Sequence, residues 1–312
     1  MSTHRLDESA AGVYIISATP FSADGRLDLD SADRLTDFYI ERGVTGITIL
    51  GMMGEAQKLT SAESLEFMRR VLARVDGRVP VVVGVSNAGL DKLASLSRQA
   101  MDAGAAGVMV APLAGLGTGA KIRRYFDLVF AALDDNVPVC YQDYPLSTNS
   151  EISVEDFGRL VADYRQLVML KHEEWPGLAK LTAVREAEAN GQRRVSILCG
   201  NGGLYLPQEL GRGADGAMTG FAFPEMLVEV VRLWRAGEHD RAEDLFDAYL
   251  PLVRHEQQPG VGLALRKELL YRRGAIASPT VRAPGPALTA RDHEELTRLV
   301  TRIERNRERL AA

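Results

Sequence analysis

The sequence predicts an α/β protein built as a (β/α)8 TIM barrel with a C-terminal helical extension, and three observations indicate this fold. Short, mostly β-branched runs alternate with longer amphipathic segments from residue 13 to about residue 235. The alternation gives eight strand-then-helix units, which is the number in such a barrel. A length of 312 residues also suits one barrel domain with an addition.

The eight units follow one another along the chain. The expected strands cover residues 13–16, 46–50, 79–84, 107–111, 137–141, 168–171, 195–199 and 216–218. The expected helices cover residues 29–42, 61–75, 92–103, 121–133, 154–164, 178–190, 204–210 and 225–236. Several strands are apolar on both faces, as parallel strands between a filled interior and covering helices should be. A doubly wound open sheet has similar local patterns, but eight units favour the closed barrel.

Two of the expected helices begin with a capping signal. Thr60 precedes Glu63 by three residues, and Ser153 precedes Asp156 by the same spacing. A hydroxyl at the first position can accept the backbone N–H three residues later, which predicts helix starts at both places.

The alternation stops near residue 238. Residues 240–253, 262–273 and 290–309 have helical periodicity, and a Gln-Gln-Pro-Gly segment and a proline-rich stretch separate them. We therefore expect a catalytic barrel over residues 1–237 and a helical extension over residues 238–312 that packs on the barrel.

The composition is that of a soluble globular protein, with 46% hydrophobic and 25% charged residues. A formal net charge of −5 gives no electrostatic reason to expect nucleic acid or a membrane surface as a partner. We expect no secretory signal, and no apolar run approaches the roughly 20 residues of a membrane span. Cys140 and Cys199 favour a reducing compartment, so we predict a cytoplasmic protein. The five histidines are too scattered to indicate a metal site.

Lys171 closes the apolar run of the sixth expected strand. In a barrel, catalytic groups lie where the strands end and the following loops begin. Desolvation at such a place lowers the pKa of an amine and increases the fraction that can attack a carbonyl. The alternative is a lysine that reaches the rim or pairs with Glu173 or Glu174.

Three loops at the same end of the barrel are candidate binding elements. Gly51, Met52, Met53 and Gly54 follow the second strand, and their glycines allow backbone N–H groups to approach a carboxylate. The fifth strand leads into a polar segment, residues 141–145, and the seventh leads into Gly200-Asn201-Gly202-Gly203. A glycine-rich segment over residues 115–121 lacks the Gly-Lys-Ser/Thr of a phosphate loop, and we expect a flexible loop over the barrel mouth.

With these motifs in order, the chain resembles the dihydrodipicolinate synthase/N-acetylneuraminate lyase family along nearly its whole length. The matching segments are residues 18–21, 51–55, 137–138, Lys171, 213–216 and 266–270. The resemblance implies a (β/α)8 barrel with a C-terminal helical extension, and a homotetramer or homodimer. It also implies that Lys171 forms a Schiff base with pyruvate or another 2-keto acid, with no metal and no organic cofactor.

The sequence departs from the family pattern at the residues that move protons. The family usually carries two threonines where Met52 and Met53 stand, and a tyrosine where Gln142 stands. Tyr141 is one residue out of register, so strand alternation sends it to the outer face. In the synthases an arginine binds the aldehyde's carboxylate, and Ser147 occupies its position here. These departures argue against dihydrodipicolinate synthase itself.

Gln142 cannot titrate, so acid/base work must pass to another group or to water. Glu173 and Asp143 are the nearest carboxylates. Alternation places Glu173 on the same side of the strand as Lys171, which favours it, and places His172 on the other side, where a structural role is expected. Asp143 is the alternative acid/base group, or it orients the glycine loops.

The sequence therefore predicts a lyase, an aldolase or a dehydratase, that acts on a small-molecule 2-keto acid or aldehyde. We expect Lys171, Gln142, Glu173 and Asp143 as its catalytic residues. The expected substrate-binding residues are Gly51, Met52, Met53, Gly54, Gly200 and Asn201. A non-catalytic barrel that binds a small acid, as a sensor or scaffold, and dihydrodipicolinate synthase proper remain alternatives.

Overall fold

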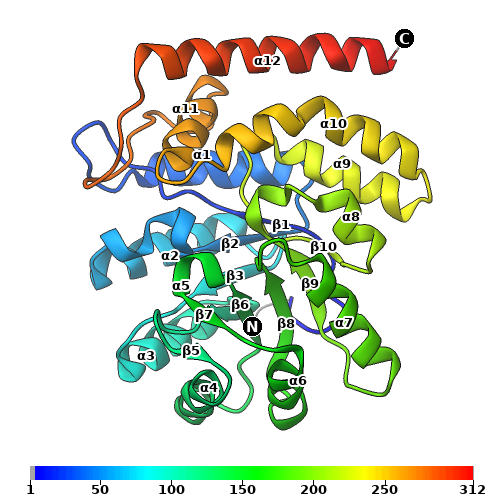
Figure 1. The fold of residues 1–312 in the computed structure, drawn as a ribbon. Helices are drawn as coiled ribbons and strands as arrows, with labels where there is room; N and C mark the ends of the chain where they lie inside the picture. The colour runs from blue at the N-terminus through cyan, green and yellow to red at the C-terminus, as the bar shows by residue number, and fades with distance from the viewer. Residues whose placement is uncertain (1–3, 312) are drawn as a thin grey trace.

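Eight parallel strands close into a barrel in the computed structural model, which describes residues 4–311 (Figure 1). The strands follow the order β1-β2-β3-β4-β6-β8-β9-β10 around the barrel, and β10 pairs with β1 to close it. Their bounds are Gly12–Ile16 (β1), Gly46–Ile49 (β2), Val81–Gly84 (β3), Gly107–Val110 (β4), Val139–Asp143 (β6), Leu167–His172 (β8), Ser196–Cys199 (β9) and Gly216–Ala217 (β10). The predicted fold class is confirmed.

A helix follows each barrel strand and covers the outside of the barrel. These helices are Leu29–Glu41 (α1), Ser61–Val75 (α2), Leu90–Asp102 (α3), Ala120–Ala132 (α4), Val154–Asp163 (α6), Leu178–Ala189 (α7), Leu206–Gly211 (α8) and Pro224–Arg235 (α9). All eight predicted units occur, with bounds shifted by a few residues. Both predicted caps are also confirmed. The Thr60 hydroxyl accepts the Glu63 N–H at 3.2 Å, and the Ser153 hydroxyl accepts the Asp156 N–H at 3.0 Å.

Strand alternation divides the apolar residues into two clusters. The larger one joins the outer faces of the strands to the helices. The smaller one, which we call the apolar floor, fills the barrel interior with the buried residues Leu6, Tyr14, Ile16, Val82, Ala106, Met109, Cys140, Val168, Met169, Leu198 and Met218. Burial raises the pKa of the Cys140 thiol to about 12, so this cysteine stays neutral and serves as a small apolar residue.

The glycine-rich segment over residues 115–121 is paired rather than free. Gly117–Thr118 (β5) forms a two-stranded parallel sheet with Ser150–Glu151 (β7), next to a one-turn helix, Pro145–Thr148 (α5). The Gly115 N–H also donates to the Thr148 carbonyl at 2.7 Å. The segment therefore contains a short strand where a loop was expected, because the next βα loop supplies a strand for it to pair with.

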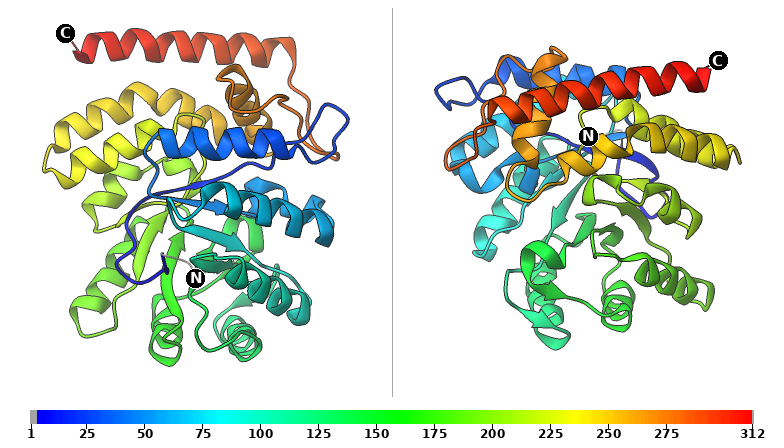
Figure 2. Two further views of the ribbon diagram at one scale, coloured as in Figure 1. Left: turned by 180° about the vertical axis from the view of Figure 1, so that it is seen from behind. Right: turned by 45° about the horizontal axis from the view of Figure 1, so that its top comes forward.

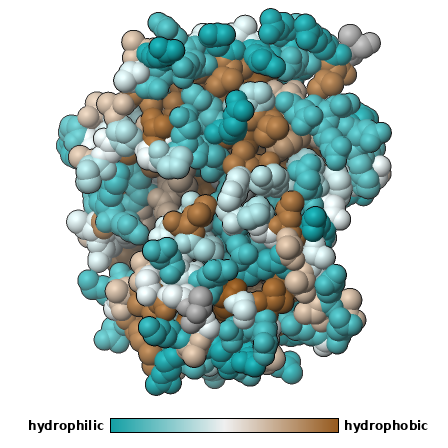
Figure 3. All heavy atoms as spheres, in the orientation of Figure 1, coloured by the Kyte–Doolittle hydropathy of each residue, from teal (hydrophilic) through white to brown (hydrophobic). Residues whose placement is uncertain are grey.

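Three further helices form the C-terminal extension: His239–Glu256 (α10), Gly262–Arg272 (α11) and Ala290–Ala311 (α12). They lie together on one side of the barrel, next to α1 and α9 (Figures 1 and 2). Hydrophilic side chains cover most of the face seen in Figure 3, and the apolar atoms there form smaller, separate patches. Within residues 4–311, every helix is too short or too polar to cross a membrane.

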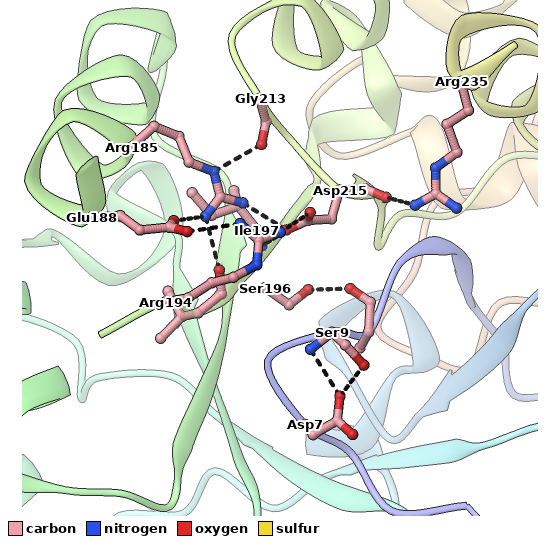
Figure 4. A network of polar contacts seen from close by, with 12 residues as sticks. Asp7, Ser9, Arg185, Glu188, Arg194, Ser196, Ile197, Gly213, Asp215 and Arg235 are labelled. Carbon is pink, nitrogen blue, oxygen red and sulfur yellow. Dashed lines mark hydrogen bonds and ion pairs between the residues drawn. The ribbon is translucent and has the colours of Figure 1, made fainter. Parts of the chain in front are cut away.

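A polar network fixes the amino ends of β9 and β10 (Figure 4). The Asp215 carboxylate accepts the Ile197 N–H at 2.8 Å and the Arg185 guanidinium at 2.6 Å, and it also pairs with Arg194. Arg235 of α9 donates to the Asp215 carbonyl at 2.8 Å. Because these bonds lie at the amino ends of the strands, Asp215 has a structural role, and the catalytic end of the barrel is opposite.

Candidate active site

Lys171 lies near the carboxyl end of β8, with its side chain inside the barrel. It follows Met169 of the apolar floor by two residues, so both side chains share the inner face. Only 4% of Lys171 is exposed. Its Nζ lies 3.0 Å from Oε2 of Glu173, which is also buried, so the amine that sequence analysis selected has a carboxylate beside it.

Glu173 is held from three directions. Gln142 of β6 donates its side-chain N–H to the Glu173 carboxylate at 2.7 Å. Asn201 donates its side-chain N–H to the Glu173 carbonyl at 2.9 Å. A Cβ at Gly200 would lie 2.1 Å from Cγ of Glu173, so only glycine leaves room for this carboxylate. Gln142, Gly200 and Asn201 thus place the carboxylate against Lys171.

The glycine loop after β2 forms one 3-10 turn, Met52–Gly54. The Gly54 N–H donates to the Gly51 carbonyl and the Glu55 N–H to the Met52 carbonyl, both at 3.0 Å. Within residues 4–311, the N–H groups of Met52 and Met53 have no hydrogen-bond acceptor. Two adjacent free N–H groups at the start of a turn form a concave site that suits a carboxylate. The Met53 side chain packs against the apolar floor.

Asp143 lies on the outer side of the barrel wall, away from Lys171. It alternates with Gln142 on β6, and its fully buried carboxylate forms an ion pair with Lys180 of α7 at 2.7 Å. Burial raises its pKa to about 6, although Lys180 opposes that shift. The expectation that Asp143 orients the glycine loops is wrong, because the Asp143 side chain accepts none of the N–H groups of those loops. His172 lies on the same outer side, 3.9 Å from Asp143, in the structural role expected for it.

Lys180 is a buried residue that sequence analysis missed. It joins Asp143 to Glu174 by ion pairs of 2.7 and 2.5 Å, and so anchors the start of the loop after β8 to α7. The sequence contained a signal, because Lys180 lies four residues before the buried Val184 and so shares its helix face. A lysine on a buried helix face requires an acidic partner.

Comparison with known proteins identifies the family. The model of the dihydrodipicolinate synthetase family matches residues 9–303. The chain belongs to this family. It is 33% identical to L-2-keto-3-deoxyarabonate dehydratase from Azospirillum brasilense over 298 residues, with 94% of each chain covered.

Two crystal structures of dihydrodipicolinate synthetase family proteins resemble the chain closely. One is a dihydrodipicolinate synthase from Rhodopseudomonas palustris, with a TM-score of 0.94, 48% identity, and 96% of this chain and 100% of that chain covered. The other is YagE from Escherichia coli K12 in complex with pyruvate, with a TM-score of 0.85, 26% identity, and 94% and 98% covered. The relatives are named as dehydratases, synthases and aldolases, so the prediction of a lyase is confirmed at the level of the family.

Tyr141 and Gln142 lie on opposite sides of the barrel wall, as strand alternation predicted. Tyr141 points outward, where its ring packs 4.7 Å from Phe126 and 5.7 Å from Phe157, measured between ring centroids. Gln142 is the side chain that faces Glu173. A carboxylate and an amide therefore lie beside the Lys171 amine on the inner face of the barrel.

A cavity of about 390 Å³ adjoins the site. Its inner wall includes Gly51, Met109 and Gln142, and from there it extends between α2 and α3. The cavity gives a small molecule room beside the glycine loop. Sequence patterns did not predict it, because its walls come from loops and helices that meet only in the folded barrel.

Proposed function

We propose that this protein is a Schiff-base dehydratase of a 2-keto-3-deoxy acid, with Lys171 as the nucleophile and Glu173 as the acid/base group. The observation that supports this most directly is the Lys171 Nζ–Glu173 Oε2 distance of 3.0 Å, with Gln142 bonded to the same carboxylate oxygen. The resemblance to an L-2-keto-3-deoxyarabonate dehydratase along 94% of the chain also supports it.

Imine formation requires a free amine and a group that carries protons. Glu173 is within reach of the Lys171 nitrogen, so it accepts a proton from the ammonium and returns it to the hydroxyl of the carbinolamine, which leaves as water. Nitrogen then holds C2 of the substrate through a C=N bond. Because Lys171 and Glu173 are almost fully buried, little bulk water competes for these protons.

The glycine loop supplies the site for the substrate carboxylate. The free N–H groups of Met52 and Met53 are neutral donors, and they replace the hydroxyls usual in the family. A carboxylate bound there fixes C1 and C2, so the imine forms in one orientation.

Elimination follows from the position of Glu173. The C3 carbon is two bonds from the imine nitrogen, so a carboxylate beside that nitrogen is near the C3 proton. Glu173 takes this proton, and the electron pair of the C3–H bond moves into an enamine with the protonated imine as the electron sink. Glu173 then gives the proton to the C4 hydroxyl, which leaves as water as the C3=C4 bond forms. The carboxylate is restored, and the product is the substrate less one water.

Aldol cleavage is the second candidate, and the similarity to YagE, named a putative 2-dehydro-3-deoxy-D-gluconate aldolase, favours it. Cleavage begins with a base at the C4 hydroxyl, whose oxygen is two bonds beyond C3, whereas dehydration begins at the C3 proton, which is closer to Glu173. Dihydrodipicolinate synthase proper is less well supported, because Ser147 replaces the arginine and donates its hydroxyl to the Met52 sulfur at 3.3 Å. A non-catalytic barrel has no support, because the Lys171–Glu173 pair is intact.

Borohydride trapping tests the proposal. The protein is incubated with pyruvate and a panel of 2-keto-3-deoxy acids and reduced, and the adduct is mapped by peptide mass spectrometry. We expect the adduct on Lys171, its loss in Lys171→Ala, and its retention in Lys180→Met, which removes the other buried lysine nearby. Without reductant, the true substrate yields a product lighter by one water. Folded protein that is trapped by no keto acid would refute the imine mechanism.

A further inference from the structure

Lys267 of α11 is a fully buried lysine in the C-terminal extension, with an exposure of 0%. Its Nζ lies 2.5 Å from Oε1 of Glu55, 2.8 Å from the Thr19 carbonyl and 2.9 Å from the Thr280 carbonyl. An ammonium has three N–H donors, so these three acceptors satisfy it completely. Its ion-pair partner, Glu55, directly follows the glycine loop.

Both oxygens of the Glu55 carboxylate are bound. Oε1 accepts Lys267, and Oε2 accepts the Lys58 ammonium at 2.9 Å and the Arg282 N–H at 3.0 Å. Glu55 is 4% exposed, and its backbone adopts the left-handed conformation, with a φ of 54°. That conformation is unfavourable for a residue with a side chain, so tertiary contacts must hold it.

Thr19, which also bonds to Lys267, holds the other side of the glycine loop. The Thr19 hydroxyl donates to the Gly54 carbonyl at 2.5 Å, and the Thr19 carbonyl accepts Lys267. Lys267 therefore joins the segment after β1, the glycine loop and the proline-rich stretch of the extension. The direction of the free N–H groups at Met52 and Met53 depends on how this loop is held.

We propose that Lys267 is a positioning residue for the active site: through Glu55 and Thr19 it fixes the glycine loop so that its free N–H groups receive the substrate carboxylate. The ligand assignment rests on the proposed function. Without Lys267, Oε1 of Glu55 is left buried without a donor, and the loop must move to hydrate it. The carboxylate site then loses its geometry while the Lys171–Glu173 pair is untouched.

The pH dependence separates this role from a purely structural one. Burial lowers the pKa of Lys267 to about 8, against the opposing effect of Glu55, while Lys58 and Arg282 lower it further and Phe21 contributes a ring 4.5 Å away. The ion pair is present below about pH 8 and is lost above it. The lysine of the unfolded chain keeps its proton to about pH 10.5, so between pH 8 and 10.5 the unfolded state binds one more proton than the folded state. The contribution of Lys267 to the free energy of unfolding therefore increases as pH rises over this range. Between pH 8 and 10.5 the affinity for the keto acid should therefore fall, whereas the contribution of Lys267 to the free energy of unfolding increases.

The experiment compares three full-length variants with the wild type. Lys267→Met removes the charge, and Glu55→Gln tests the pair from the other side. Arg273→Met is the matched control, since Arg273 also ties α11 to the barrel, through Glu225 at 2.6 Å, but has no contact with the glycine loop. Two quantities are measured at pH 7 and pH 9: the pyruvate concentration that gives half-maximal trapping on Lys171, and hydrogen exchange of the amides in residues 51–58.

In Lys267→Met and Glu55→Gln we expect the half-saturating concentration to rise about tenfold with the trapping plateau retained, as for loss of one buried charge-assisted bond. Exchange at Gly54, Glu55 and Lys58 should accelerate by a similar factor. Arg273→Met should change neither quantity, and the pH 9 increase should appear in the wild type but not in Lys267→Met. Unchanged loop exchange in folded Lys267→Met would overturn the proposal. Absence of trapping in the wild type would instead refute the proposed imine, and exchange would still decide the role of Lys267.

Discussion

Replacing Glu173 by glutamine should separate imine formation from the proton transfers that follow. The side chains have nearly equal volume, so the fit against Gly200 is kept, and Gln142 can still donate to the oxygen of the new amide. The amide cannot accept the C3 proton, so the variant loses the base that lies 3.0 Å from the amine. Removing a positioned acid/base group lowers the rate about 10²- to 10⁴-fold. At about 1.4 kcal/mol for each factor of ten, the activation free energy rises by about 3–5 kcal/mol.

The assay does not require the natural substrate. Enamine formation exchanges the C3 protons of bound pyruvate for deuterium in D2O, and proton NMR measures the rate. We expect Glu173→Gln to lose this exchange. Borohydride should still trap pyruvate on Lys171 after long incubation, but at a lower rate, because water must then carry the protons of imine formation. Glu174→Gln is the matched control, because the neighbouring carboxylate pairs with Lys180 instead, and its exchange rate should be retained. Glu173→Gln with the exchange rate of the wild type would refute the assignment.

Three further predictions concern the surroundings of the site. Gly200→Ala places a methyl group 2.1 Å from Cγ of Glu173, so deuterium exchange into pyruvate should fall at least about tenfold while thermal unfolding shows a folded protein. Tyr141→Phe removes a buried hydroxyl that has no hydrogen-bond partner within residues 4–311, so urea unfolding should show equal or greater stability, by up to about 1 kcal/mol, with unchanged turnover. Because the folded pKa of Asp143, about 6, lies above its ordinary value of 3.8, this group's contribution to stability is present at pH 3.8 and is lost as pH rises through 6. Urea titrations of the wild type and Asp143→Asn should therefore differ in pH slope across that range, and parallel slopes would contradict the raised pKa.

The sequence predicted the barrel and the placement of Lys171 and Glu173 on its inner face because both follow from short-range rules. Strand periodicity identifies the eight units, and alternation alone places Glu173 on the side of Lys171 and Tyr141 on the other. Asp143 was misassigned because its partner, Lys180, lies on a helix 37 positions later, and no local pattern links them. The Glu55–Lys267 pair spans 212 positions and is determined by how the extension packs. Similarly, β5 and β7 are too short to have a recognisable period.

The apolar floor limits the routes by which water can reach the proposed covalent intermediate. Cys140 and Met169 fill the barrel immediately below Gln142 and Lys171, so in the proposed mechanism the water that hydrolyses the imine must arrive from the same side as the acid. A long substrate chain that occupies this opening protects its own imine from premature hydrolysis. Once the leaving group has departed and the chain has shortened or shifted, water gains access and frees the lysine. In that mechanism, the size of the bound molecule would set the timing of its release.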